Sequence, residues 1–121
     1  NIKGKIINFS SIGGEIGFPN NHSYGPSKSG LSQLTKTLAN DWGKYGININ
    51  TIVPGYFSTE MNKASWFNKY KKKERSKKTL FNRWGKPSEI IGPVVFLSSE
   101  ASSYITGTEL VVDGGWLAKG L

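Results

Sequence analysis

The stretch from Ser11 to Lys28 contains three side chains whose types and spacing suit proton transfer. Tyr24 and Lys28 are four residues apart, so on a helix their side chains share one face. A free tyrosine phenol has a pKa of roughly 10, and a neighbouring ammonium favours the phenolate. A serine hydroxyl such as that of Ser11 can bind a substrate oxygen on which charge develops. Together the three groups could act on a carbonyl or an alcohol.

Two predicted elements would hold these side chains in place. Residues 5–9 form an apolar run, rich in β-branched side chains and ended by serine, which is typical of a short buried strand. Ser11 would then lie at the carboxyl end of that strand, where open α/β sheets bind ligands. A helix is predicted from Ser23, its N-cap, to about Tyr45, with Pro26 in the first turn. The strand end and the helix start would bring the serine close to the tyrosine–lysine pair.

The loop between these elements, residues 10–22, contains three glycines. Gly13, Gly14 and Gly17 lack the G-x-G-x-x-G spacing of a phosphate-binding loop, so we interpret them as turn residues that supply backbone freedom. His22 is the only histidine in the sequence, and no second ligand type accompanies it. We therefore assign it no catalytic role and expect no metal site.

The predicted helix also carries a stripe of large apolar residues at three- and four-residue spacing. Such a stripe indicates a packing face, which would lie against a core or against a partner subunit. Its members are Leu31, Leu34, Leu38 and Trp42. A second copy of the chain is therefore one candidate partner.

Two more strands and one more helix are predicted downstream. The strands are Asn48–Val53, which a Pro-Gly dipeptide ends, and Glu109–Val112. Ile90–Leu97 is predicted to be a largely buried helix because it is almost entirely apolar, and Pro93 within it could introduce a kink. The order strand, helix, strand, irregular segment, helix, strand predicts a three-layer α/β arrangement with a parallel sheet.

The irregular segment, residues 58–84, is predicted to form one or two short helices with a charged outer face. Much of the net charge of +8 lies in residues 69–78. Three interpretations stay open: a solvated helix surface, attraction of an anionic substrate into an adjacent cleft, and nucleic-acid binding. In the third, Trp66, Phe67 and Tyr70 would stack on bases. It is the least favoured, because no recognised nucleic-acid module accompanies the charge.

Length and composition set further bounds. The chain of 121 residues is enough for one domain over residues 1–121. It contains no cysteine, which excludes disulfides and thiolate metal sites and fits a reducing compartment. No apolar run approaches the roughly 18 residues that a membrane span needs. We therefore expect no membrane partner, and the cytoplasm is the default location.

In combination, these motifs resemble the short-chain dehydrogenase/reductase family. Ser11 is followed by twelve residues and Tyr-x-x-x-Lys, then by Pro-Gly after the next strand and by Val-Asp-Gly-Gly near the end. The resemblance implies the α/β fold of a Rossmann-like doubly wound parallel sheet, of which this chain would supply the last three strands and their crossover helices. It also implies an enzyme that interconverts a secondary alcohol and a ketone with NAD or NADP, and a substrate lid at residues 58–84.

The resemblance further implies a role for each matching residue. Tyr24 would be the general acid/base, and Ser11 would hold the substrate oxygen. Lys28 would favour the phenolate and bind the nicotinamide ribose. With Tyr24 and Lys28, the segment after the second strand would hold the cofactor, through Pro54, Gly55, the backbone of Phe57 and Thr59.

The pattern is most similar to gluconate 5-dehydrogenases and 2-dehydro-3-deoxy-gluconate 5-dehydrogenases, with 3-oxoacyl-acyl-carrier-protein reductases further away. That similarity implies a sugar or sugar acid as substrate and a homodimer or homotetramer. The chain begins with Asn1 directly before a strand and lacks the family's glycine-rich pyrophosphate loop, so we expect the C-terminal half of a longer protein. The choice between NAD and NADP stays open, because the discriminating residue follows an absent strand. The alternative function is an inactive basic module for oligomerisation or nucleic-acid binding.

Overall fold

The computed structural model describes residues 3–119, which form a parallel sheet of three strands in the order β1-β2-β3. These strands are β1 (Gly4–Phe9), β2 (Ile47–Pro54) and β3 (Glu109–Val112). Gly4 pairs with Ile47, and Thr51 pairs with Glu109. The three predicted strands are confirmed. β1 begins one residue earlier than predicted, and β2 is one residue longer at each end.

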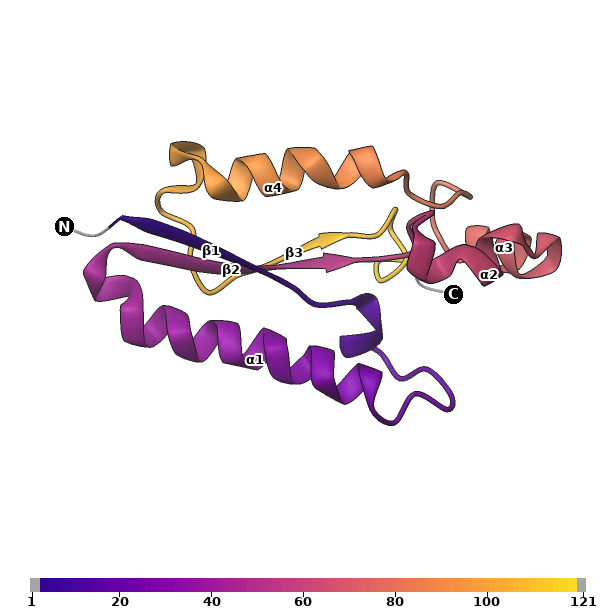
Figure 1. Cartoon of the computed structure of the whole chain (residues 1–121), viewed down its shortest axis with the longest axis horizontal. Coiled ribbons are helices and arrows are strands. Elements are labelled where there is room, and N and C mark those ends of the chain that lie inside the picture. Colours follow the sequence, from indigo (N-terminus) through magenta and orange to yellow (C-terminus); the bar gives the residue numbers. More distant parts are fainter. Residues whose placement is uncertain (1–2, 120–121) are drawn as a thin grey trace.

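Helices cover both faces of the sheet (Figure 1). α1 (Tyr24–Trp42) lies on one face and α4 (Ile91–Ser98) on the other, while α2 (Lys63–Phe67) and α3 (Lys69–Ser76) lie near the carboxyl ends of the strands. Short 3-10 turns occur at η1 (Ile12–Gly14), η2 (Gly43–Tyr45), η3 (Glu60–Asn62), η4 (Pro87–Ile90) and η5 (Glu100–Ser102). Within residues 3–119, no helix combines the length and the apolar character that crossing a bilayer requires. The three-layer prediction is confirmed.

The centre of the core is the middle strand, whose residues Asn50 to Val53 are buried. α1 packs on it through small side chains, including Ser32, Thr35 and Ala39. The large apolar stripe of α1 does not face this core: Leu34 is 47% exposed and Trp42 38%. The core alternative is therefore wrong for Leu34 and Trp42, whereas Leu31 and Leu38 are half-buried. The fully buried face of α1 consists of small residues, which let the helix approach the sheet closely.

The prediction that the last helix is largely buried is also wrong. Leu97 is the buried residue of α4, whereas Ile91 and Val95 are each 59% exposed. An almost uniformly apolar segment does not show which of its faces meets the sheet. Pro93 lies in the first turn of α4, where its missing N–H removes no intrahelical hydrogen bond, so it starts the helix instead of kinking it.

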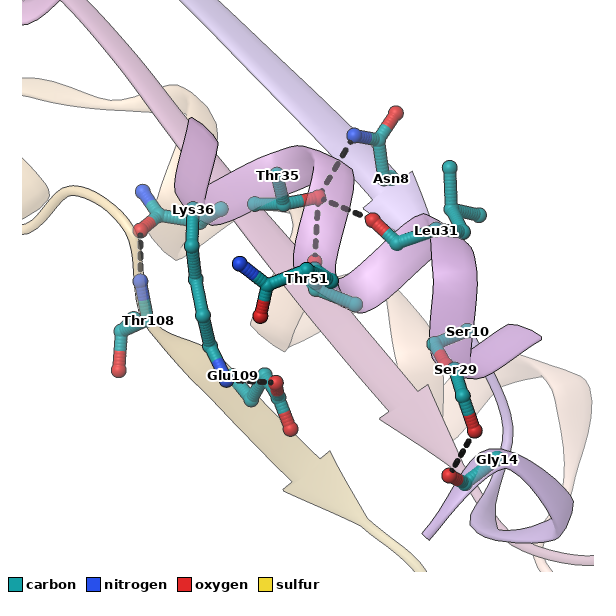
Figure 2. A network of polar contacts seen from close by, with 12 residues as sticks. Asn8, Ser10, Gly14, Ser29, Leu31, Thr35, Lys36, Thr51, Thr108 and Glu109 are labelled. Atoms are coloured by element: carbon teal, nitrogen blue, oxygen red, sulfur yellow. Dashed lines mark hydrogen bonds and ion pairs between the residues drawn. The ribbon is translucent and has the colours of Figure 1, made fainter. Parts of the chain in front are cut away.

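A buried hydroxyl joins α1 to two strands (Figure 2). Thr35 Oγ1 accepts hydrogen bonds from Asn8 Nδ2 at 2.8 Å and from Thr51 Oγ1 at 2.8 Å, and it donates to the Leu31 carbonyl at 3.0 Å. The Thr35 side chain is fully buried. The Thr35 hydroxyl thus accepts hydrogen bonds from two donors that would otherwise lack this partner inside the protein.

Thr35→Val tests this network, because valine keeps the shape of threonine but leaves both donors unpaired. Each unsatisfied buried group costs about 1–3 kcal/mol, so the free energy of unfolding should fall by roughly 2–4 kcal/mol, measured by urea denaturation of the complete protein. Thr37→Val is the matched control, since its exposed hydroxyl bonds only the Gln33 carbonyl of its own helix. Equal losses in the two variants would contradict the assigned role.

Candidate active site

The predicted serine lies at the end of β1. Ser11 occupies the N-cap position of η1, and its Oγ accepts a hydrogen bond from the Gly13 N–H at 3.0 Å. A hydroxyl has one proton to donate, and this bond uses only its acceptor side. The Ser11 proton is therefore left to bind an oxygen atom in front of the turn.

The start of α1 differs from the prediction in its capping residue. Ser23 is at the N-cap position, but its backbone is already helical and its side chain makes no capping bond. Asn21 takes this role, because its Oδ1 accepts from the Gly25 N–H at 3.3 Å. Pro26 is in the first turn as predicted, and His22, which precedes the helix, is exposed.

The serine turn and α1 touch through two glycines. A Cβ on Gly14 would lie 2.9 Å from the Ser29 backbone nitrogen, and a Cβ on Gly25 would lie 2.8 Å from the Gly13 carbonyl oxygen. Ser29 Oγ also donates to the Gly14 carbonyl (Figure 2). Gly13, Gly14 and Gly17 all lack a positive φ, so the expectation that they supply backbone freedom is wrong. Close approach of two backbones is what excludes a side chain at Gly14 and Gly25.

Lys28 fastens the helix to the end of β1. Its Nζ donates to the Phe9 carbonyl at 2.9 Å, and its own carbonyl accepts from Ser10 Oγ at 3.0 Å. The same Nζ lies 5.7 Å from the centroid of the Tyr24 ring. The predicted tyrosine–lysine pair is thus on one face of α1, as its four-residue spacing requires.

A cavity of about 560 Å³ opens at the carboxyl ends of β1 and β2. Ser11 and Tyr24 both line it, whereas Lys28 lies beside Tyr24 and outside the lining. The residues predicted to hold a cofactor line the same cavity from the segment after β2: Pro54, Gly55, Phe57 and Thr59. The structure therefore brings all but one of the predicted site residues to one cavity, and places that one next to the tyrosine.

The segment after β2 is held in place by two close contacts. A Cβ on Gly55 would lie 2.8 Å from the Asp113 Cα, so this turn lies directly against the segment that follows β3. Phe57 forms a parallel bridge with Gly85, which places its ring against that glycine. The bridge uses the Tyr56 carbonyl and the Ser58 N–H, so the Phe57 N–H is left outside it.

An aromatic cluster that the sequence analysis missed supports one wall of the cavity. Tyr56 lies 5.0 Å from Trp84 and 5.1 Å from Trp116, measured between ring centroids, and Phe18 lies 6.0 Å from Trp116. The guanidinium of Arg75 lies over the Tyr56 ring, 4.6 Å from its centroid. The sequence feature that could have indicated this cluster is the tryptophan content, since four tryptophans in 121 residues need apolar partners.

The segment 58–84 contains α2 and α3, as predicted, and reaches the cavity through Thr59, Met61, Asn62 and Arg75. Its far end is fixed by Arg83, whose guanidinium forms two hydrogen bonds to Glu89, at 2.8 and 2.7 Å. The hydrogen bonds from the Arg83 side chain are the main reason why the pKa of Glu89 is lowered to about 2. A hydrogen bond from the Lys86 backbone N–H is the second reason. The negative charge of Glu89 therefore persists across the neutral and mildly acidic range.

A second charged group lies behind the serine turn, on the α1 side of the sheet. Lys36 Nζ is 2.9 Å from a Glu109 carboxylate oxygen, and this hydrogen bond raises the pKa of Lys36 (Figure 2). The pKa of Glu15 is raised mainly by burial of its carboxyl group, and secondly by the neighbouring Glu109 carboxylate. These side chains link α1 to the start of β3 and lie outside the cavity lining.

A parallel sheet with helices on both faces, and with a cavity at the carboxyl ends of its strands, is typical of open α/β proteins. Proteins of this class bind ligands, often dinucleotides, at that edge of the sheet. The comparisons with known proteins narrow the class to one family. A family model described as enoyl-(acyl carrier protein) reductase matches residues 1–117. The chain belongs to the short-chain dehydrogenase/reductase family.

Individual relatives agree with this assignment. The chain is 42% identical to 2-dehydro-3-deoxy-D-gluconate 5-dehydrogenase of Escherichia coli K12, covering 96% of this chain and 46% of the relative. It is 42% identical to gluconate 5-dehydrogenase of Gluconobacter oxydans, covering 93% and 44%. A crystal structure of a gluconate 5-dehydrogenase from Burkholderia cenocepacia in complex with NADP and tartrate superposes with a TM-score of 0.94 at 38% identity, covering 98% and 46%.

These coverages have a structural meaning. The chain spans about half the length of the curated relatives that it matches. The three strands and their helices thus correspond to part of a Rossmann-like sheet, as the resemblance implied. Both the family and the truncated α/β fold are confirmed.

Proposed function

We propose that the protein containing this chain is a nicotinamide-dependent oxidoreductase that interconverts a secondary alcohol and a ketone on a sugar acid. One observation carries the proposal: Ser11 and Tyr24 line one cavity, with the Lys28 ammonium beside the tyrosine ring. A hydroxyl donor, a phenol and a cation at one point can bind an alcohol oxygen and move its proton.

Each residue has a distinct part in the proposed reaction. In the oxidation direction, Tyr24 takes the proton of the substrate hydroxyl as general base, and in reduction it returns that proton. The Lys28 ammonium, 5.7 Å from the centroid of the tyrosine ring, places a positive charge beside the phenol. Ser11 donates its proton to the substrate oxygen, because the hydrogen bond from the Gly13 N–H leaves that proton unused. Residues 58–84 act as a lid that carries side chains to the cavity.

The remaining site residues fit a nicotinamide cofactor. When bound, NAD or NADP supplies the hydride acceptor in oxidation and the hydride donor in reduction. Pro54, Gly55 and Thr59 line the cavity, and the Phe57 N–H, which the bridge to Gly85 does not use, is suited to a carboxamide oxygen. Lys28 would hydrogen-bond the nicotinamide ribose.

The substrate class follows from the relatives. Two relatives above are named for gluconate or a deoxy-ketogluconate, and the solved Burkholderia enzyme was bound to NADP and tartrate. We infer the same class of polyhydroxy acid here. The test is an assay of the complete protein with D-gluconate and 2-dehydro-3-deoxy-D-gluconate, each with NAD and NADP, following nicotinamide absorbance. Absence of turnover on every pair, together with absence of cofactor binding by calorimetry, would overturn the proposal.

A second copy of the chain is the proposed partner. The stripe of α1, in which Leu34 and Trp42 are exposed, offers an apolar face that can pack against the same face of a second copy in a two-fold dimer. A homodimer or homotetramer would cover this face. The alternative of a basic interaction module depends on the exposed Phe67 and Tyr70 among the lysines. Salt-sensitive binding of nucleic acid without turnover would favour that alternative.

A further inference from the structure

The cavity contains one charged residue, and it comes from the lid. Arg75 is in the last turn of α3 and lines the cavity together with Ser11 and Tyr24. Every other lining residue is apolar, a glycine, or neutral and polar. The formal charge of the residues that line the cavity is therefore +1. Neighbouring lysines of α3 do not line it: Lys69, Lys71 and Lys73 are exposed, and Lys72 lies over Trp66.

Among the residues that the structure describes, Arg75 has no anionic partner of its own. None of the ion pairs formed within residues 3–119 involves it. Its position is nevertheless fixed, because its guanidinium is stacked on Tyr56 at 4.6 Å and Tyr56 is packed between Trp84 and Trp116. A half-buried cation without a counter-ion, held by aromatic packing, is prepared to receive an anion.

We propose that Arg75 binds the carboxylate of the acid substrate and so determines the preference for acids over neutral polyols. This inference rests on the proposed function, since it needs a substrate whose reacting hydroxyl lies at Tyr24. A planar guanidinium matches a carboxylate with two parallel hydrogen bonds, which a lysine cannot reproduce. The acid end would lie at α3 and the reacting carbon at the serine turn, so one cation fixes the orientation of the substrate.

The experiment compares two substrates that differ only at the carboxylate. D-gluconate and its neutral amide, D-gluconamide, are assayed with wild-type complete protein, Arg75→Gln and Arg75→Lys. Losing a charged hydrogen-bonded pair should lower kcat/KM for gluconate by roughly 10- to 100-fold in Arg75→Gln. The value for gluconamide and the KM for the cofactor should change less than about twofold, and Arg75→Lys should recover part of the loss.

Lys73→Gln is the matched control, because it removes an exposed cation from the same helix without touching the cavity. It should leave kcat/KM for gluconate within about twofold of wild type, as expected for a screened surface charge. Binding of tartrate, followed by tryptophan fluorescence from Trp84 and Trp116, gives a readout that does not depend on turnover. Arg75→Gln should weaken it and Lys73→Gln should not.

The outcomes separate this inference from the proposed function. Turnover with equal losses on gluconate and gluconamide in Arg75→Gln would leave the oxidoreductase in place and overturn the role of Arg75. A raised KM for the cofactor alone would also overturn it, since the guanidinium would then bind a cofactor phosphate. Wild-type protein that turns over neither these substrates nor 2-dehydro-3-deoxy-D-gluconate, and that binds no cofactor by calorimetry, would overturn the proposed function itself.

Discussion

Tyr24→Phe should lower kcat by roughly 10²–10⁴-fold, because it removes the proposed general acid/base and keeps the ring that lines the cavity. Phenylalanine retains the packing of the first turn of α1, so the fold should be unaffected. The cofactor affinity should fall by about tenfold at most, since the loss of one hydroxyl contact costs roughly 0.5–1.5 kcal/mol. The measurement is kcat for sugar-acid oxidation together with calorimetric binding of NAD and NADP.

Tyr45→Phe is the control for this prediction. Tyr45 is an exposed tyrosine in η2, at the opposite end of α1, and its ring lies near the Lys44 ammonium. It therefore repeats the same chemical change beside a cation, away from the cavity. Its kcat should equal that of wild type. A kcat for Tyr24→Phe that also stayed within a few-fold of wild type would refute the acid/base role.

The local elements of this fold could be read from the sequence because local physics determines them. The β-branched run of β1 favours a strand from its own side chains, and the Pro-Gly dipeptide after β2 marks the turn that ends one. The four-residue spacing of Tyr24 and Lys28 predicts a shared helix face without knowledge of the sheet. The position of the candidate site residues could be predicted for the same reason, since the serine, the tyrosine and the lysine lie at the ends of predictable elements.

The contacts between elements could not be read in the same way. α1 fully buries Ser32, Thr35 and Ala39 but none of its leucines, and a pattern of hydrophobicity alone predicts the opposite. Arg75 belongs to a run of basic residues in the sequence, and only the packing of α3 against Tyr56 distinguishes it from its neighbours. Both failures concern the direction in which a helix face points, and that direction depends on distant residues.

Gly25→Ala should lower kcat by roughly 10²-fold by displacing the serine turn from Tyr24, since a misplacement of about 1 Å can cost that much. The new Cβ would lie 2.8 Å from the Gly13 carbonyl oxygen, which is a backbone atom and cannot rotate away. The turn that carries Ser11 must then move relative to α1, or the first turn of the helix must open. Either change separates the Ser11 hydroxyl, proposed to bind the substrate oxygen, from the Tyr24 phenol, proposed to move its proton.

Gly30→Ala separates this effect from a general loss of fold. Gly30 is on the same helix, and a Cβ there would meet nothing within 4 Å. Alanine should stabilise the helix by about 1 kcal/mol and leave kcat unchanged. Both variants are compared by kcat and by thermal unfolding of the complete protein, so that activity is judged only on folded enzyme. If folded Gly25→Ala kept wild-type kcat, close contact between the serine turn and α1 would not be what aligns Ser11 with Tyr24.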